Sequence, residues 1–256
     1  AGDATSRGVR LAFIAMTGEM GYPSALTAKT WGYYDVMFKG NEFSFTQPYG
    51  SYVMENILFK ISYPAEFHAQ TAVEAAMTLH AEVKDKIDDI ERIEIETQEP
   101  GVRIIDKTGP LDNPADRDHC LQYMIAVPMI FGHLTAADYE DDIANDPRID
   151  ILREKMQVRE NENYTKDYFA ADKRYIGNAI QVFFRDGSST EKVAVDYPIG
   201  HRQRREEGIP VLIQKFKGSV SGKLRSAQWE KLDAVCADRA TLSGMPVDDF
   251  MALLVV

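Results

Sequence analysis

Apolar positions along the chain recur mostly at helical spacing, and this pattern predicts helices at both ends. Near the start, Val9 and Phe13 lie one turn apart and the other faces are also apolar, which predicts a helix over residues 5–20 capped by Asp3 or Thr5. A helix that is apolar nearly all round is typical of the interior of a larger helical assembly. Helical spacing and start or stop residues predict further helices over residues 24–38, 65–83, 116–131, 135–145, 148–154, 209–217, 226–240 and 247–254.

Strand patterns are confined to the middle of the chain. Alternation over residues 92–97 predicts a strand with one solvated face, and residues 154–160 predict a second, short strand. The Asp186-Gly187 pair between two alternating runs predicts a hairpin of residues 179–184 and 191–197. Residues 161–168 are interpreted as a polar loop.

The order of these elements predicts an α+β fold. Helices come first, helices and strands mix in the middle, and helices return at the end. We therefore expect an α/β module over residues 41–200, inserted between helical segments 1–40 and 201–256 that pack together.

Charge and composition exclude several function classes. The net charge of −11 and pI of about 5.0 argue against a nucleic-acid partner, and no apolar run is long enough for a membrane span. The two cysteines, Cys120 and Cys236, are too few for a secreted disulfide framework or an iron–sulfur cluster. No histidines pair at metal-ligand spacing, so we expect neither a metal site nor a cofactor.

Residues 60–68 carry the strongest candidate chemistry. An extended segment breaks into a helix there, with Pro64 expected in the first helical turn. A helix N-terminus favours a bound carboxylate, and Lys60, Glu66 and His68 add a cation, a carboxylate and an imidazole able to move a proton. The alternative is that Lys60 and Glu66 are solvated and His68 is a half-buried surface residue.

Six stretches together resemble a known family across nearly the whole chain. They are Gly2-Asp3-Ala4-Thr5-Ser6-Arg7, residues 18–28 (GEMGYPSALTA), residues 48–56 (PYGSYVMEN), residues 60–76 (KISYPAEFHAQTAVEAA), residues 113–120 (NPADRDHC) and Tyr197-Pro198-Ile199-Gly200-His201. With these residues the chain is identified as a member of the MmgE/PrpD family.

The resemblance implies both a fold and a reaction. Members have a large helical domain and a smaller α/β lid, with the active site in the cleft between them. The implied reaction is the elimination of water from 2-methylcitrate, without a metal, to give 2-methyl-cis-aconitate in propionate breakdown. A related member, cis-aconitate decarboxylase, removes carbon dioxide from a similar tricarboxylate.

Family chains are about twice as long, so the resemblance implies that this chain is a C-terminal part. The N-terminal half would supply most of the helical domain and a lysine just before the position of Ala1, and we expect it as a partner. By itself the chain is then expected to be inactive, or to be a tricarboxylate-binding fragment without catalysis. A homodimer is left open, as is the compartment: cytoplasm in a bacterium, mitochondrial matrix in a eukaryote.

The resemblance also assigns roles to residues in the central stretch. Lys60 is implied to bind a substrate carboxylate. Glu66 falls where the decarboxylase relative has a histidine, which implies an acid or base, and His68 is the alternative imidazole. Cys120 is expected to be a buried small hydrophobe.

Further along the chain, four residues are candidates for contact with the substrate. Arg103 falls near a position that the relative uses for the substrate, although a surface arginine is an equal alternative. Arg117 and His119 lie where a helix is predicted to begin, and Tyr123 follows one turn later. The alternatives are that residues 116–118 only cap that helix and that Tyr123 belongs to the core. The basic run 202–205 is expected to be a solvated or interdomain patch.

Overall fold

The computed structural model describes residues 2–44 and 57–255. The chain divides into two compact units, Ala1–Tyr52 and Val53–Val256. This division differs from the three predicted segments, because residues 201–256 group with the middle of the chain. The packing of segment 1–40 against segment 201–256 stays a prediction.

The first unit contains helices α1 (Gly2–Met16) and α2 (Tyr33–Phe38). α1 begins before both predicted caps, and the Asp3 carboxylate lies inside it, 3.0 Å from the Arg7 side chain one turn later. The predicted helix 24–38 forms only over its last residues, because Thr30 has a φ of 75° that interrupts it. α1 has no buried residue within the described part of the chain, and Phe13 is 65% exposed.

The second unit contains a mixed sheet of four strands in the order β2-β1-β3-β4. Its strands are β1 (Ile90–Thr97), β2 (Met156–Glu160), β3 (Asn178–Phe184) and β4 (Val193–Val195). β1 and β2 are parallel, whereas the β1–β3 and β3–β4 pairs are antiparallel. The predicted strands and hairpin are confirmed, with β4 shorter than residues 191–197. The hairpin turn has Gly187 at a φ of 84°, a conformation that favours glycine.

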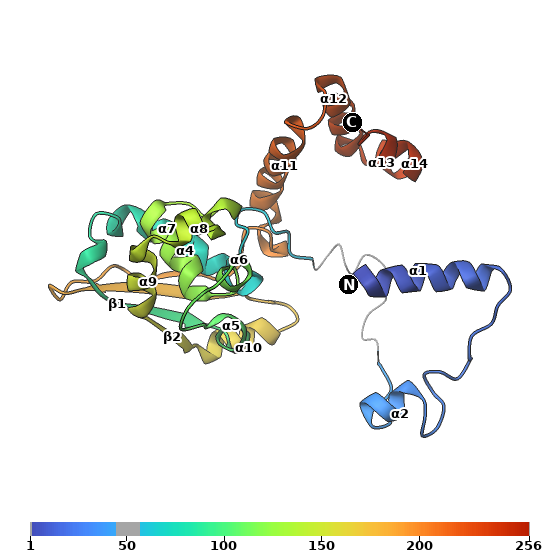
Figure 1. Cartoon of the computed structure of the whole chain (residues 1–256), viewed down its shortest axis with the longest axis horizontal. Helices are drawn as coiled ribbons and strands as arrows, with labels where there is room; N and C mark the ends of the chain where they lie inside the picture. The colour runs from blue at the N-terminus through green and yellow to red at the C-terminus, as the bar shows by residue number, and fades with distance from the viewer. Residues whose placement is uncertain (1, 45–56, 256) are drawn as a thin grey trace. The chain divides into compact units, whose positions relative to one another are not determined.

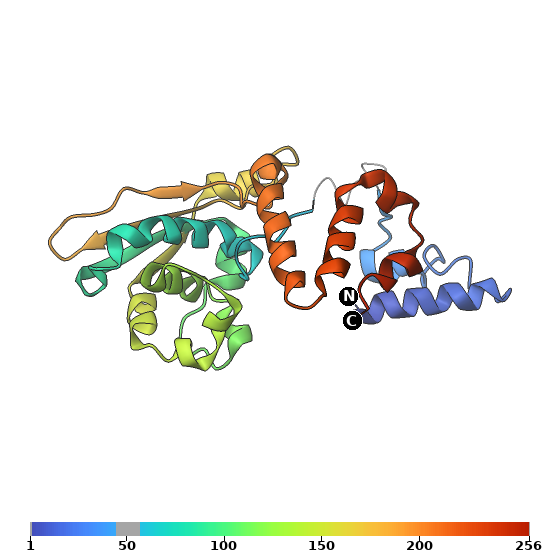
Figure 2. The same ribbon diagram turned by 90° about the horizontal axis from the view of Figure 1, so that it is seen from above.

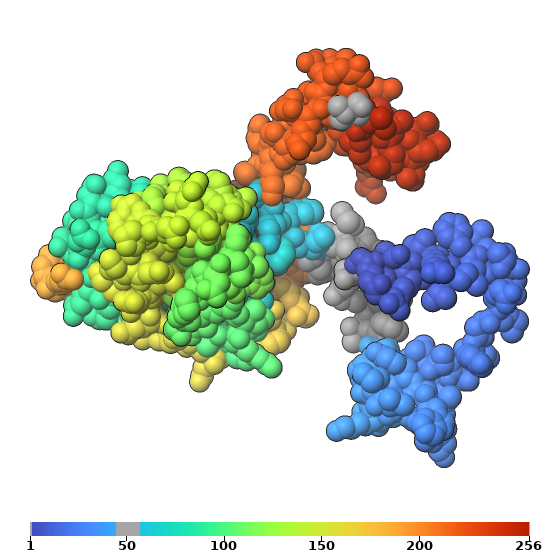
Figure 3. Space-filling view, viewed as in Figure 1, coloured from blue at the N-terminus to red at the C-terminus, as the bar shows by residue number. Residues whose placement is uncertain are grey.

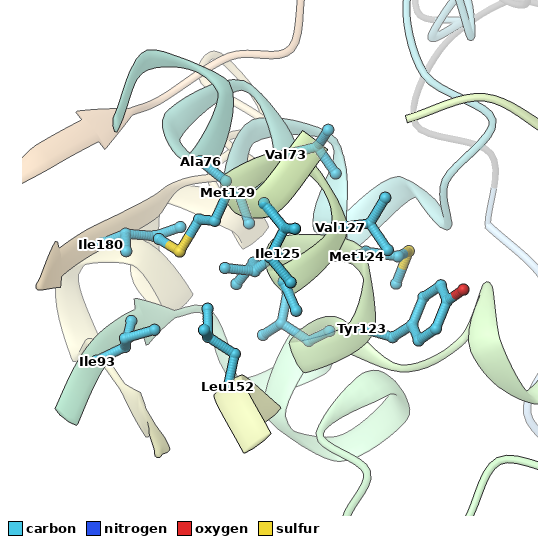
Figure 4. Close-up of a cluster of buried hydrophobic side chains, with 14 of the residues drawn as sticks. Val73, Ala76, Ile93, Tyr123, Met124, Ile125, Val127, Met129, Leu152 and Ile180 are labelled. Atoms are coloured by element: carbon cyan, nitrogen blue, oxygen red, sulfur yellow. The ribbon is translucent and has the colours of Figure 1, made fainter. Parts of the chain in front are cut away.

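One face of the sheet is covered by helices (Figures 1 and 2). α4 (Gln70–Val83) packs against β3 and β4, and α7 (Leu121–Phe131) lies between α4 and α9 (Pro147–Glu154). Ile93 and Ile180 point from the sheet toward α7 and Leu152 of α9 in Figure 4, and all three residues are fully buried. The cyan, green and yellow segments accordingly form one closely packed body in Figure 3.

The opposite face of the sheet carries charge, as predicted for residues 92–97. Glu96 of β1 contacts Arg159 of β2 and Lys192 beside β4, both at 2.8 Å. The hydrogen bond from Lys192 is the main cause that lowers the pKa of Glu96 to about 2. The charged positions of β1 therefore face away from the helices, and its apolar positions face toward them.

The crossover from β1 to β2 contains short helices. They are α5 (Glu99–Ile105), α6 (Pro114–Arg117), α8 (Asp141–Ala144) and the 3₁₀ turn η3 (Ala136–Tyr139), whereas the turn η2 (Ile87–Asp89) lies just before β1. Glu99-Pro100-Gly101 begins α5, since proline fits a first helical turn. The predicted helix 116–131 is split, because residues 118–120 leave the helix between α6 and α7.

A further correction concerns residues 161–168, which form helix α10 (Glu162–Phe169) and not a loop. The Asn161 side chain accepts hydrogen bonds from the amides of Asn163 and Tyr164 at 3.0 and 3.4 Å, which caps the helix. The polar composition of this segment concealed a helix that is exposed on one side.

The chain ends in helices α11 (Arg205–Ser221), α12 (Ser226–Ala237), α13 (Arg239–Gly244) and α14 (Val247–Ala252). Ser226 is the first helical residue of α12, and Arg225 takes the cap position without a side-chain hydrogen bond. Leu232, Val235 and Leu253 form a small core of their own here. The turn η4 (Arg202–Arg204) leads into α11.

Candidate active site

The candidate site is built where the extended segment 57–66 meets the turn η1 (Phe67–Ala69), which leads directly into α4. Pro64 lies before this turn, so its predicted place in the first helical turn is wrong. Glu66 is the cap of η1, and its carboxylate accepts a hydrogen bond from the backbone amide of His68 at 2.8 Å. The carboxylate that the helix start was predicted to bind is therefore supplied by the chain itself.

Glu66 also binds the His68 ring. Its two carboxylate oxygens lie 2.9 Å from Nδ1 of His68, and the side chains are 15% and 13% exposed, respectively. Burial raises the pKa of Glu66, but the hydrogen bonds and charge of His68 outweigh it and lower the pKa below its ordinary value. Glu66 is thus a carboxylate that orients His68, rather than a proton donor.

The other ring nitrogen of His68 faces Tyr168 of α10. His68 Nε2 lies 3.4 Å from the Tyr168 hydroxyl, and the two rings are 5.7 Å apart with an interplanar angle of 32°. Because Glu66 accepts the Nδ1 proton, Nε2 of the neutral ring carries a lone pair. Sequence reasoning missed Tyr168 because its segment was interpreted as a loop. The capping Asn161 followed by Tyr164 and Tyr168 at helical spacing was the available signal.

The backbone of His68 is fixed from strand β3. The fully buried Asn178 side chain donates to the His68 carbonyl at 2.8 Å and to the Thr71 hydroxyl at 2.6 Å. Thr71 in turn donates to the Ile176 carbonyl at 2.5 Å. Buried hydrogen bonds of this kind are costly to break, so the imidazole is carried by a rigid support.

Lys60 lies beside the same turn. Its ammonium is 4.8 Å from the centre of the Phe67 ring, and its carbonyl accepts a hydrogen bond from Lys215 at 2.6 Å. Lys60 is exposed, and among residues 2–44 and 57–255 no carboxylate forms an ion pair with it. The site therefore presents an accessible cation within a few residues of the Glu66–His68 pair.

His119 belongs to the same neighbourhood, whereas Arg117 is used elsewhere. The charge of His119 contributes to lowering the pKa of Glu66, and its Nδ1 lies 2.6 Å from Asp118. Arg117 is 5% exposed and donates to the Tyr139 carbonyl at 2.6 Å and to Asp141 at 2.7 Å. This geometry favours a structural role for Arg117, joining α6 to η3 and α8. The predicted helix start at these residues is wrong, since Arg117 ends α6.

Tyr123 and Arg103 occupy opposite environments. Tyr123 is 2% exposed, stacks on Tyr139 at 5.8 Å and donates its hydroxyl to the Asp138 carbonyl. Burial raises the pKa of Tyr123 to about 12. These contacts favour the core alternative for Tyr123 over contact with the substrate. Arg103 is exposed on α5, a helix that packs against both η1 and α10.

The side chains of the basic run 202–205 form hydrogen bonds to several other segments. Arg204 binds both carboxylate oxygens of Glu74 at 2.9 Å and the Tyr197 carbonyl at 2.7 Å. Arg202 donates to the carbonyls of residues 171 and 172, and Arg205 donates to the Ile57 carbonyl at 2.9 Å. These contacts link the run to the expected module 41–200, which favours the interdomain alternative over a solvated patch. Cys120 is fully buried, as predicted.

Two further features of the described residues bear on the remaining predictions. Within residues 2–44 and 57–255, no three His, Cys, Asp or Glu side chains cluster in a way that would hold a metal ion. None of the helices described there has the length and apolar character needed to cross a membrane. Independence from metal stays a prediction.

The chain is similar to a known family and to several known proteins. Residues 63–238 match the MmgE/PrpD C-terminal domain, and residues 1–46 match the MmgE/PrpD N-terminal domain. The whole chain is 60% identical to 2-methylcitrate dehydratase of Salmonella typhimurium and 58% identical to that of Escherichia coli, covering 54% of each protein. It is also 58% identical to mitochondrial 2-methylcitrate dehydratase of Yarrowia lipolytica, covering 49% of that protein. The chain thus spans about half the length of the curated relatives it matches. Since the C-terminal match alone covers most of the sequence, the chain belongs to the MmgE/PrpD family.

Proposed function

We propose that the protein to which this chain belongs is a hydro-lyase that converts 2-methylcitrate to 2-methyl-cis-aconitate in propionate catabolism. The relatives named above support the substrate. The observation that carries the chemistry is the Glu66–His68 pair, with Nδ1 of His68 2.9 Å from the carboxylate and Lys60 beside it. An oriented imidazole next to an accessible cation suits proton removal from a carbon that bears a carboxylate.

In the proposed reaction, Nε2 of His68 takes the proton from the methyl-bearing carbon. The electron pair of that C–H bond forms the double bond, and the hydroxyl of the neighbouring carbon leaves as water after taking a proton from an acid. Glu66 stabilises the imidazolium that forms, and Lys60 binds the carboxylate on which negative charge develops. His119 and Arg103 are the proposed contacts for the other carboxylates, and no metal or cofactor takes part.

The rest of the proposal concerns the whole protein. The remaining half completes the site, which makes it the main partner, and a homodimer is compatible with this arrangement. We place the enzyme in the cytoplasm of a bacterium or the mitochondrial matrix of a eukaryote, and the name of the Yarrowia relative supports the latter case.

Two alternatives remain as competing proposals. One is a decarboxylase acting on cis-aconitate, and the other is a fragment that binds a tricarboxylate without turnover. The 57–60% identity to several proteins named 2-methylcitrate dehydratase favours dehydration.

The test is to incubate the whole protein with 2-methylcitrate and with cis-aconitate. Absorbance of the conjugated product follows dehydration, and a carbon dioxide assay runs beside it. We expect an absorbance increase with 2-methylcitrate and no gas release. Carbon dioxide from cis-aconitate without dehydration of 2-methylcitrate would overturn the proposal in favour of the decarboxylase.

A further inference from the structure

Tyr168 of α10 has no role in the proposed mechanism, although its hydroxyl lies 3.4 Å from Nε2 of His68. This nitrogen is the atom assigned to proton removal. The Tyr168 hydroxyl can donate its proton to a ring nitrogen that carries a lone pair. The contact therefore favours the form of the His68 ring that is unprotonated at Nε2. Catalytic hydrogen bonds are often long before a substrate binds, and 3.4 Å fits that state.

The two side-chain contacts of His68 favour the same tautomer of its ring. Glu66 accepts the proton of Nδ1, and the Tyr168 hydroxyl donates toward Nε2. The ring of His68 contacts these two side chains, and its backbone is bound by the Asn178 amide and the Glu66 carboxylate. The nearby charged groups are Lys60, which lies over Phe67, and His119, which acts on Glu66.

The fold holds Tyr168 firmly. α10 is capped by Asn161 at its start, and Asp167 pairs with Lys173 at 2.7 Å just after its end. Arg202 donates to the carbonyls of Ala171 and Asp172 at 2.9 and 2.7 Å, which ties the loop after α10 to the start of the C-terminal helices. The helix that carries the phenol is therefore held by contacts at both of its ends.

We propose that Tyr168 is a positioning residue for the dehydration. Its hydroxyl and the Glu66 carboxylate together hold the His68 ring in the tautomer that has its proton on Nδ1, with Nε2 ready to accept a proton from the substrate. This inference rests on the proposed function for its kinetic consequences but not for its structural ones.

The test compares Tyr168→Phe with Tyr164→Phe in the whole protein. The first variant keeps the ring and removes only the hydroxyl. The second removes a hydroxyl from another tyrosine of the same helix. The ring of Tyr164 packs near Gly177 and not on His68. Circular dichroism first shows that both variants are folded. Kinetics and chemical modification are then measured for the parent and both variants.

For Tyr168→Phe we expect kcat to fall by about three- to tenfold, the equivalent of one lost hydrogen bond, with KM within about twofold. The acid limb of the pH profile of kcat/KM should move to higher pH, by about half to one pH unit, because the variant lacks the bond that favours the uncharged ring. Tyr164→Phe should leave both unchanged.

The second readout does not need activity. Diethyl pyrocarbonate modifies unprotonated imidazole nitrogens, and mass spectrometry of peptides measures the rate at His68. Without the Tyr168 hydroxyl, Nε2 of His68 should react several times faster in Tyr168→Phe than in the parent or in Tyr164→Phe. If 2-methylcitrate is not dehydrated by the parent, the proposed function fails and this rate alone decides the inference. An unchanged rate and an unmoved acid limb, or equal effects from both tyrosine variants, would overturn the role of Tyr168.

Discussion

At the residue scale, two histidines of this chain are held in opposite ways. His68 is paired with a carboxylate, whereas His201 is 2% exposed and stacked on Tyr197, with ring centres 4.5 Å apart. His201 Nδ1 accepts a hydrogen bond from the Gln203 amide at 3.1 Å. Burial, followed by the charge of Arg202, lowers the pKa of His201 to about 4. His201 is therefore neutral in the folded chain over the physiological range.

The pKa of His201 differs between the folded and the unfolded chain, so the free energy of unfolding depends on pH. The pKa of His201 is about 4 when folded and about 6.5 when unfolded, so its contribution is complete above pH 6.5 and is lost as the pH falls toward 4. At pH 5 the loss should be about 2 kcal/mol. Denaturant unfolding of the parent and of His201→Gln, at pH 7.5 and pH 5, measures it. The parent should lose more stability than the variant, and equal losses would contradict the assignment.

Lys60 supports a second prediction at this scale. A charge-assisted hydrogen bond to a substrate carboxylate is worth roughly 1.5–3 kcal/mol, so Lys60→Met should lower kcat/KM of the whole protein by about ten- to a hundredfold. Met keeps the apolar stem and removes the charge. Lys217→Met is the matched control and should have no effect, since this lysine of α11 has a half-buried side chain 3.8 Å from Asp233. A folded Lys60→Met variant within about twofold of the parent would show that Lys60 is only solvated, and Arg103 and His119 would become the leading contacts.

At the scale of elements, the ends of α7 and of the β3–β4 hairpin use glycine in different surroundings. Gly132 ends α7 at a φ of 73°, and a Cβ there would lie 2.7 Å from Nε2 of His80. Gly187 has a φ of 84° with nothing within 4 Å of the same position. Both sites disfavour other residues because of the backbone, but only Gly132 is also crowded.

The pair therefore separates backbone strain from packing. Gly187→Ala should cost about 1 kcal/mol of unfolding free energy. Gly132→Ala should cost at least about 1 kcal/mol more, since His80 must move and its hydrogen bond to the Met129 carbonyl at 3.0 Å would be disturbed. Denaturant unfolding of both variants checks the difference. Equal costs would mean that His80 moves aside freely.

At the scale of the whole molecule, the first unit exposes large apolar side chains. Large apolar side chains of α1, such as Val9, Phe13 and Met16, are more than half exposed within their own unit. Exposed apolar surface of this kind marks a region that packs against further protein. The relatives are about twice as long as the chain, so the rest of the protein is the proposed cover.

The corresponding prediction concerns activity. The chain of 256 residues should give no measurable dehydration of 2-methylcitrate, whereas the whole protein should turn it over and keep its rate after treatment with EDTA. The absorbance assay described above measures both. Turnover by the chain at the rate of the whole protein would show that the other half is not needed. Loss of activity with EDTA, restored by one added metal, would disprove the metal-free proposal.

The sequence by itself determined the family, the α+β class, the strands and the stretch that carries the Glu66–His68 pair. These depend on periodicity and on residues close together in the chain, which are local properties. The bounds of the predicted helices 24–38 and 116–131 were wrong, and residues 161–168 were predicted as a loop although they form a helix, because these features depend on single backbone conformations and caps, such as Thr30 and Asn161.

Only the tertiary structure decided what each candidate side chain contacts. Tyr168 meets His68 across 100 residues of sequence, Asn178 fixes the His68 backbone from a strand, and Arg117 is drawn away to Tyr139 and Asp141. Tyr123 proved to be core because α7 is buried along its whole length except its last residue. Such contacts join segments distant in sequence, and no local pattern of residues records which of them will meet.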